Sequence, residues 1–155
     1  MENFLWTTNV TITESRINMS ATELKSRELT AREGQVVGTI RDMAGQAPYI
    51  VNTGISYNNF SNGWEAGVYY NVQGPTLNLI GFGNRTDTYT VPFHALNLNI
   101  NKTFGADERI RTSLGVQNLL NDKREIVFSS FGAQDQIFTQ LAPGTRVNFS
   151  VGFSF

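Results

Sequence analysis

The chain ends in the stretch Thr145-Arg146-Val147-Asn148-Phe149-Ser150-Val151-Gly152-Phe153-Ser154-Phe155. From residue 147 onward, every odd position is apolar and every even position is polar or glycine. Successive side chains of a strand point to opposite faces, so this alternation predicts a β-strand with one apolar and one polar face. A terminal phenylalanine has nothing to bury against in water, whereas a lipid interface suits it. We therefore interpret the stretch as a transmembrane strand whose lipid-facing side chains are Val147, Phe149, Val151, Phe153 and Phe155.

The composition argues against nucleic-acid binding, membrane-spanning helices and cysteine chemistry. The 155 residues carry a net charge of -1 with mixed signs, which offers no basic surface for nucleic acid. The mean hydropathy is -0.23, and no apolar run approaches the ~18 residues of a membrane-spanning helix. A transmembrane β-barrel stays compatible with these values because its strands alternate. The absence of cysteine excludes disulfides, thiolate nucleophiles and cysteine-ligated zinc.

Five further alternating stretches precede the last one, at about 4–14, 49–58, 64–73, 93–103 and 109–118, and the last spans about 145–155. The stretch 93–103 has the clearest pattern, because lipid-facing Leu96, Leu98 and Ile100 alternate with Asn97, Asn99 and Asn101. Three asparagines on a dry face would lack partners, whereas a water-filled lumen accepts them. The expected lumen-facing residues include Glu65, Asn97, Asn99, Arg111 and Arg146.

The connections alternate between long and short. Residues 15–48, 74–90 and 118–144 are expected to be long loops, and residues 59–63 and 104–107 are expected to be short turns. We interpret the charged run at 23–28 as a solvated loop, with a short helix as the alternative. In outer-membrane barrels the short turns are periplasmic and the long loops extracellular, which sets the expected orientation.

Six antiparallel strands do not close a barrel. The smallest single-chain bacterial barrels have about eight strands, and an open sheet edge in lipid leaves unpaired N–H and C=O groups. We expect these edges to pair with strands from outside residues 1–155: a larger barrel, further copies of the chain, or an assembling barrel. The first residues also lack the basic start and long apolar stretch of a secretory signal, so we expect a trimmed chain or part of a longer one.

Three segments carry a resemblance to a known family: Asn118-Leu119-Leu120-Asn121-Asp122, residues 41–52, and Pro143-Gly144-Thr145-Arg146 before the last strand. Together they resemble the C-terminal region of TonB-dependent outer-membrane receptors. The resemblance implies an all-β chain forming the last six strands of a barrel of about 22 strands. It also implies uptake of a scarce nutrient such as an iron chelate, haem, cobalamin or a glycan. The plug domain of that family has no counterpart in residues 1–155.

The same resemblance implies partners. These are outer-membrane lipid, the remaining strands and plug of the receptor, the barrel-assembly machinery and, indirectly, TonB. Asn148, Phe153 and Phe155 look like the C-terminal signal that the assembly machinery reads, although the small residue expected between them is Ser150 rather than glycine. The alternative function is therefore a segment captured by an assembly or secretion complex through its last strand, by strand addition.

Catalysis and metal binding have little support in the sequence. His94 is the only histidine, and a lone imidazole is more often structural than a metal ligand. An enzyme built into the barrel would need Ser113 or Asp87 beside His94, and nothing in the sequence brings them together. We expect no enzyme activity, no metal and no cofactor. A water-soluble β-sandwich is the remaining alternative, because alternation alone would also suit it.

Overall fold

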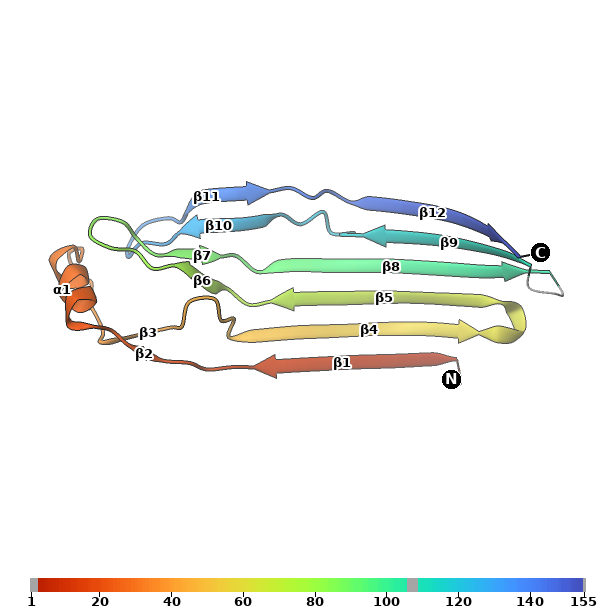
Figure 1. Cartoon of the computed structure of the whole chain (residues 1–155), viewed down its shortest axis with the longest axis horizontal. Helices are drawn as coiled ribbons and strands as arrows, with labels where there is room; N and C mark the ends of the chain where they lie inside the picture. The colour runs from red at the N-terminus through yellow and green to blue at the C-terminus, as the bar shows by residue number, and fades with distance from the viewer. Residues whose placement is uncertain (1–2, 106–108, 155) are drawn as a thin grey trace.

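The computed structural model describes residues 3–105 and 109–154, and within them the protein is an all-β chain with one short helix. Its main sheet has six antiparallel strands in the order β1-β4-β5-β8-β9-β12 (Figure 1). The strands are β1 (Phe4–Ile12), β4 (Tyr49–Asn59), β5 (Trp64–Gln73), β8 (Phe93–Phe104), β9 (Ile110–Gln117) and β12 (Arg146–Phe153). The prediction of an all-β, antiparallel fold is confirmed. Each strand of the main sheet overlaps one of the predicted stretches, although the sheet is open.

The second sheet corrects the sequence prediction, which had loops at 74–90 and 118–144. Its four strands, in the order β11-β10-β7-β6, are β6 (Thr76–Leu79), β7 (Thr88–Thr90), β10 (Arg124–Phe128) and β11 (Gln136–Leu141). Figure 1 shows each of them continuing a strand of the main sheet beyond a short break. Gly74-Pro75 and Pro92 mark two of these breaks, because proline cannot donate to a sheet ladder.

The first long connection also contains regular structure. The helix α1 (Ala21–Leu29) contradicts the interpretation of residues 23–28 as a solvated loop. Ser20 caps it by accepting a hydrogen bond from the Glu23 backbone N–H at 3.2 Å, and a glutamate at this spacing completes the sequence pattern of a capping box. The short strands β2 (Ile17–Asn18) and β3 (Ile40–Arg41) pair with one another beside this helix.

The short connections lie at the opposite end of the sheet from α1 (Figure 1). Between β4 and β5 the chain forms the 3-10 helix η1 (Phe60–Asn62), and Gly63 then adopts a left-handed conformation with φ 63°. Glycine adopts that conformation without strain, so Gly63 favours a turn at this position of the sequence. The expected turn at 104–107 falls partly on residues 106–108, which lie outside the described residues.

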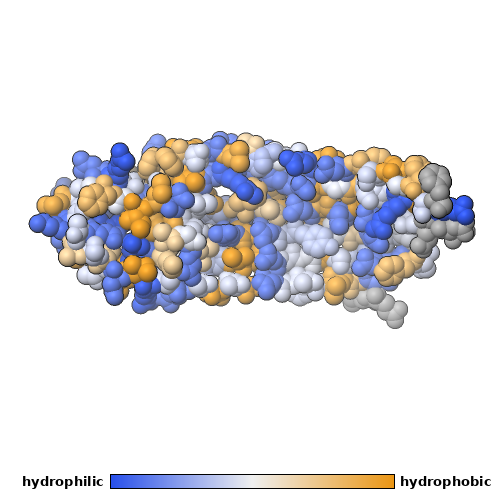
Figure 2. Space-filling model, viewed as in Figure 1, coloured by the Kyte–Doolittle hydropathy of each residue, from blue (hydrophilic) through white to orange (hydrophobic). Residues whose placement is uncertain are grey.

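Very little of the main sheet is buried. Among the described residues the buried apolar side chains are Ala47, Val72, Leu77 and Val127, which lie at or beyond the loop end of the strands. The extensive contacts between elements are those between hydrogen-bonded neighbours, so none of the described elements forms a second layer over the main sheet. In the face seen in Figure 2, hydrophobic residues are scattered among hydrophilic ones. The main sheet is therefore a single layer.

None of the helical residues described could cross a membrane, since α1 is short and polar.

Candidate functional site

The strand register sorts the side chains of the main sheet into two faces. Directly opposed residues in antiparallel strands lie on the same face, and one row across all six strands is entirely apolar. That row consists of Trp6, Ile55, Val68, Leu98, Val116 and Val147. The next row, Phe4, Tyr57, Ala66, Ile100, Leu114 and Phe149, lies on the same face. Trp6 is 73% exposed and Phe149 is 70% exposed, so nothing in the described chain covers this apolar face.

Leu96 and Val151, which are also predicted to face lipid, lie on this same face. Leu96 opposes Tyr70, and Val151 opposes Thr112, which in turn opposes Lys102. At the short-turn end of the sheet the Lys102 ammonium lies 4.9 Å from the centre of the Trp64 ring. A cation and an aromatic ring at a strand end are typical of a membrane–water interface, where the charge reaches water and the ring meets the lipid.

The predicted lumen-facing residues lie on the opposite, polar face. Asn99 opposes Gly67 and Gly115, and Asn97 opposes Tyr69. Arg146 opposes Gln117 at the loop end of the same face. The structure thus places the asparagines of β8 in the middle of a surface that no other element covers.

Glu65 and Arg111 are joined across β8. The Arg111 Nη2 atom donates to Glu65 Oε2 at 2.6 Å, and the Asn101 amide donates to the same oxygen at 3.3 Å. The Arg111 side chain is 53% exposed, so solvent screens the pair and its contribution to stability is small. Glu65 thus connects β5 to both β8 and β9 near the short turns.

A hollow of about 590 Å³ lies on the polar face near the loop end. Tyr69, Asn97, Asn99, Gln117, Arg124 and Arg146 are among the residues that line it. Its wall combines the aromatic rings of Tyr69 and Phe93 with amide and guanidinium groups, and these polar groups can form several hydrogen bonds. This hollow contains three of the five residues predicted to face the lumen.

Asn118 holds the break between β9 and β10. It is 7% exposed and has a positive φ of 52°, and its side-chain amide donates to the carbonyl oxygens of Asp122 at 3.0 Å and Gly144 at 3.1 Å. Its side-chain oxygen accepts from the Asp122 N–H at 3.0 Å, and Thr145 Oγ1 donates to its carbonyl at 2.9 Å. Asn118 therefore connects the two sheets through one buried side chain.

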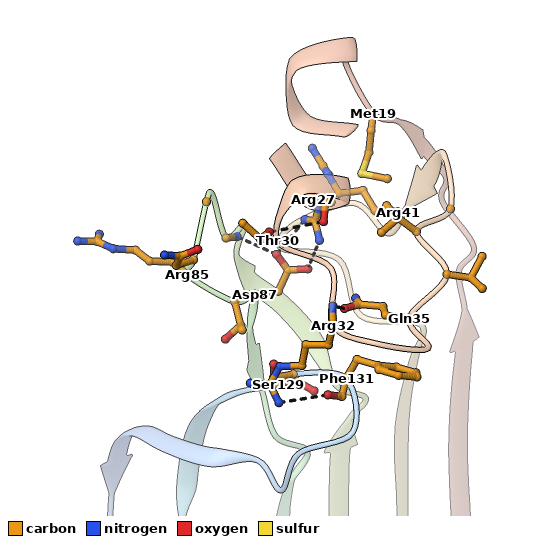
Figure 3. Close-up of a pocket in the computed structure, with 18 of the residues that line it drawn as sticks. Met19, Arg27, Thr30, Arg32, Gln35, Arg41, Arg85, Asp87, Ser129 and Phe131 are labelled. Carbon is orange, nitrogen blue, oxygen red and sulfur yellow. Dashed lines mark hydrogen bonds and ion pairs between the residues drawn. The ribbon is translucent and has the colours of Figure 1, made fainter. Parts of the chain in front are cut away.

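A second hollow, of about 500 Å³, lies among the long connections (Figure 3). Four arginines and two aspartates are among the residues that line it: Arg27, Arg32, Arg41, Arg85, Asp42 and Asp87. Figure 3 shows that Arg85 points away from the hollow, whereas Arg27 and Asp87 point toward one another. Arg32 Nη1 donates to the Phe131 carbonyl at 3.4 Å, which joins the first connection to the third.

The two most buried arginines of this hollow are paired. Arg27 donates to both oxygens of Asp87, and Arg41 Nε donates to Glu23 at 2.7 Å. The hydrogen bonds that Arg27 donates to the Asp87 carboxylate raise the pKa of Arg27, although burial opposes this. Burial also raises the pKa of Tyr89, a half-buried neighbour on β7. Since Arg27 and Arg41 are paired with carboxylates from the long connections, their contacts hold these connections together.

The structure does not assemble a catalytic group around His94. Its Nδ1 atom lies 2.6 Å from the Tyr70 hydroxyl, and its backbone N–H donates to Asp122 at 2.7 Å. Ser113 opposes Asn101, seven positions further along β8 and on the other face, and Asp87 is paired with Arg27. No cluster of histidine, aspartate and glutamate residues able to hold a metal ion occurs in residues 3–105 and 109–154.

The proposed assembly signal is only partly described. Asn148 opposes Gly115 on the polar face, whereas Phe153 opposes Ile110 on the apolar face and is 64% exposed. Phe155 lies outside the described residues. Within the described residues β12 pairs with β9 alone, so its outer edge is open.

Two groups of residues were missed by the sequence reasoning. Tyr69 was not recognised as a site residue, although Gly54 and Gly67 on the same face leave room for its ring. The Arg27–Asp87 contact joins residues sixty positions apart, and no local signal marks it. The Ser20–Glu23 spacing would have identified the helix that carries Arg27.

No protein-family model, curated protein or solved structure matches this chain.

Proposed function

We propose that this chain is the C-terminal wall of a TonB-dependent outer-membrane transport barrel, which takes up a scarce nutrient across the bacterial outer membrane. The observation that carries this proposal is the single-layer main sheet. One face is mostly apolar and the other mostly polar, and large apolar side chains such as Trp6 and Phe149 are exposed among the described residues. A soluble fold buries its apolar face against another layer, whereas a barrel wall exposes it to lipid.

The strand lengths support the proposal. β8 has twelve residues, which at ~3.3 Å per residue and a tilt of ~45° would cross roughly 28 Å. The apolar band of an outer-membrane barrel is about 25 Å tall. The aromatic residues Phe4, Tyr57, Trp64 and Phe104, near the short turns, suit the interface at one end of this span.

The open edges support a larger barrel. β1 and β12 each have one hydrogen-bonded neighbour among the described residues. Their free backbone groups would cost several kcal/mol each in hydrocarbon, so further strands of the receptor would pair with both. The start of β1 and the end of β12 lie at the short-turn end of the sheet (Figure 1), which would be the periplasmic end.

Site-specific labelling tests this proposal. The sequence has no cysteine, so one introduced cysteine gives a unique label. In the complete barrel that contains this chain, reconstituted into lipid vesicles, Leu98→Cys and Phe149→Cys should resist a membrane-impermeant maleimide, and their neighbours Asn99→Cys and Asn148→Cys should react. Reaction of all four at equal rates would refute the proposal.

A second candidate function follows from the open edge of β12. Every residue of this strand is exposed, and its backbone is available for strand addition to an assembly or secretion complex. Replacing Phe153 with Asp should then abolish capture of the chain by purified assembly machinery, and Phe138→Asp on β11 should not. Unchanged capture of the Phe153 variant would exclude this candidate.

A further inference from the structure

The Tyr69 ring lies on the surface of the main sheet instead of standing up from it. Gly54 opposes Tyr69 across the β4–β5 pair, and Gly67 precedes it by two residues on the same face. A Cβ atom added at Gly54 would lie 2.5 Å from Tyr69 Cδ1. One added at Gly67 would lie 2.6 Å from both Cε2 and the hydroxyl oxygen. Both edges of the ring therefore rest on glycine backbone, and no larger residue fits beneath it.

The upper side of this ring is open. Tyr69 is 44% exposed and forms part of the wall of the hollow on the polar face. Asn97 opposes it directly, and Asn99 approaches it, since its Oδ1 atom would lie 2.7 Å from a Cβ at Gly67. The ring is thus a flat apolar platform with amide groups at its edge.

This combination fits a sugar better than the other cargo classes. A pyranose has an apolar C–H face that packs on an aromatic ring, and equatorial hydroxyls that bond to amides and guanidinium groups. A haem would also stack, but the only histidine of the sequence, His94, lies on the apolar face of the sheet. An anionic iron chelate would be held by Arg124 and Arg146 toward the loop end of the hollow, whereas the Tyr69 ring is bordered by the amides of Asn97 and Asn99, which pair with hydroxyl groups.

We propose that Tyr69, with Asn97 and Asn99, forms a binding subsite for a pyranose unit of an oligosaccharide on the polar face of the barrel wall. The Gln117 amide and the Arg146 guanidinium lie further along the same hollow and extend the subsite toward a second sugar unit. This inference rests on the proposed function, because it takes the polar face to be the lumen. It narrows the cargo of the transporter to a glycan.

Titration of the complete barrel that contains this chain, in lipid nanodiscs, with maltohexaose and separately with a galacturonic acid hexamer, tests the subsite by calorimetry. Tyr69→Ala should weaken binding roughly tenfold, or about 1.4 kcal/mol, because it removes both the stacking ring and the apolar area that the sugar buries. Tyr69→Phe should retain most of the affinity. Gly67→Ala, which displaces the ring, should weaken binding while keeping every polar group.

The matched control is Tyr70→Ala, which removes the adjacent tyrosine from the apolar face and should leave affinity unchanged. Binding of neither hexamer, or equal losses for the Tyr69 and Tyr70 variants, would overturn the proposal. Haemin binding without oligosaccharide binding would overturn it as well. The maleimide labelling experiment tests the membrane-embedded sheet independently of sugar binding. If residues 98 and 149 are protected and residues 99 and 148 react while no oligosaccharide binds, the glycan subsite is wrong and the proposed barrel wall stands.

Discussion

Arg27 on α1 and Asp87 before β7 form a two-fold contact between the first and second long connections. Arg27 Nη1 lies 3.0 Å from Asp87 Oδ2, and Arg27 Nη2 lies 2.9 Å from Asp87 Oδ1. The side chains are only 25% and 14% exposed, and Asp87 Oδ1 also accepts from the Gly81 N–H at 2.7 Å. A paired geometry of this kind is stronger and more specific than a single surface ion pair.

Breaking this contact should loosen the loops. Asp87→Asn leaves the partly buried Arg27 without its countercharge, and we expect a local loss of about 1–3 kcal/mol. Hydrogen exchange at residues 21–29 and 80–90 should therefore accelerate by roughly tenfold to a hundredfold. Glu14→Gln is the control, since Glu14 and Arg16 form a pair that is 72% and 70% exposed. Unchanged exchange in the Asp87 variant would contradict this role.

Asn118 should be the residue on which the junction of the two sheets depends. Asn118→Ala removes its buried hydrogen bonds and also places alanine at a positive φ, so we expect a loss of roughly 2–4 kcal/mol. Asn118→Gly should cost about 1 kcal/mol less, because glycine tolerates that conformation. Thermal unfolding of the reconstituted protein measures both variants.

Asn121 provides the control for this prediction. It has a similar φ of 53° but is exposed, so Asn121→Gly should leave stability nearly unchanged. Equal effects of glycine at positions 118 and 121 would show that backbone conformation, and not the hydrogen bonds of Asn118, holds the junction.

Deprotonation of Tyr89 at high pH should lower the stability of the region around β7. Burial raises its pKa above the usual 10.0, and Asp87 and Asp42 act in the same direction while Arg27 opposes them. Between the unfolded and folded pKa values the folded protein holds the extra proton, so stability is full below pH 10 and falls as pH rises through the folded pKa. Tyr89→Phe should remove that part of the decline.

Thermal unfolding at several pH values between 8 and 11.5 checks this expectation. The wild type and the Tyr89→Phe variant should show parallel behaviour below pH 9 and diverge above pH 10. Identical curves throughout that range would contradict the assignment to Tyr89.

The six strands of the main sheet were predictable because their alternation reflects two different surroundings. Leu96, Leu98 and Ile100 alternate with asparagines over the whole of β8, and a period of two residues is typical of a strand with two unlike faces. β7 (Thr88–Thr90) is too short for a pattern, so it forms only beside β6 and β10. The helix α1 is polar with no buried residue, and only its cap indicates it in the sequence. The Tyr69 platform depends on a cross-strand partner, Gly54, that the sequence alone does not pair with it.

The two faces should differ in their tolerance of charge. Leu98→Arg places a guanidinium on the apolar face, which should cost about 2–4 kcal/mol near the middle of a bilayer. Asn99→Arg places the same group on the polar face, where it stays hydrated and should cost little. Urea unfolding of the protein folded into vesicles compares the two variants. Equal costs at these adjacent positions would contradict the assignment of the faces.

Tryptophan quenching in lipid vesicles tests most directly whether the apolar face meets hydrocarbon. Trp6 and Trp64 are the only tryptophans, and both lie on that face. Lipids with brominated acyl chains should quench both, and aqueous iodide should quench neither strongly. A single tryptophan at position 99, introduced by Asn99→Trp in a Trp6→Phe, Trp64→Phe background, should show the reverse. Strong iodide quenching of Trp6 and Trp64 with no effect of brominated lipid would contradict a membrane-embedded sheet.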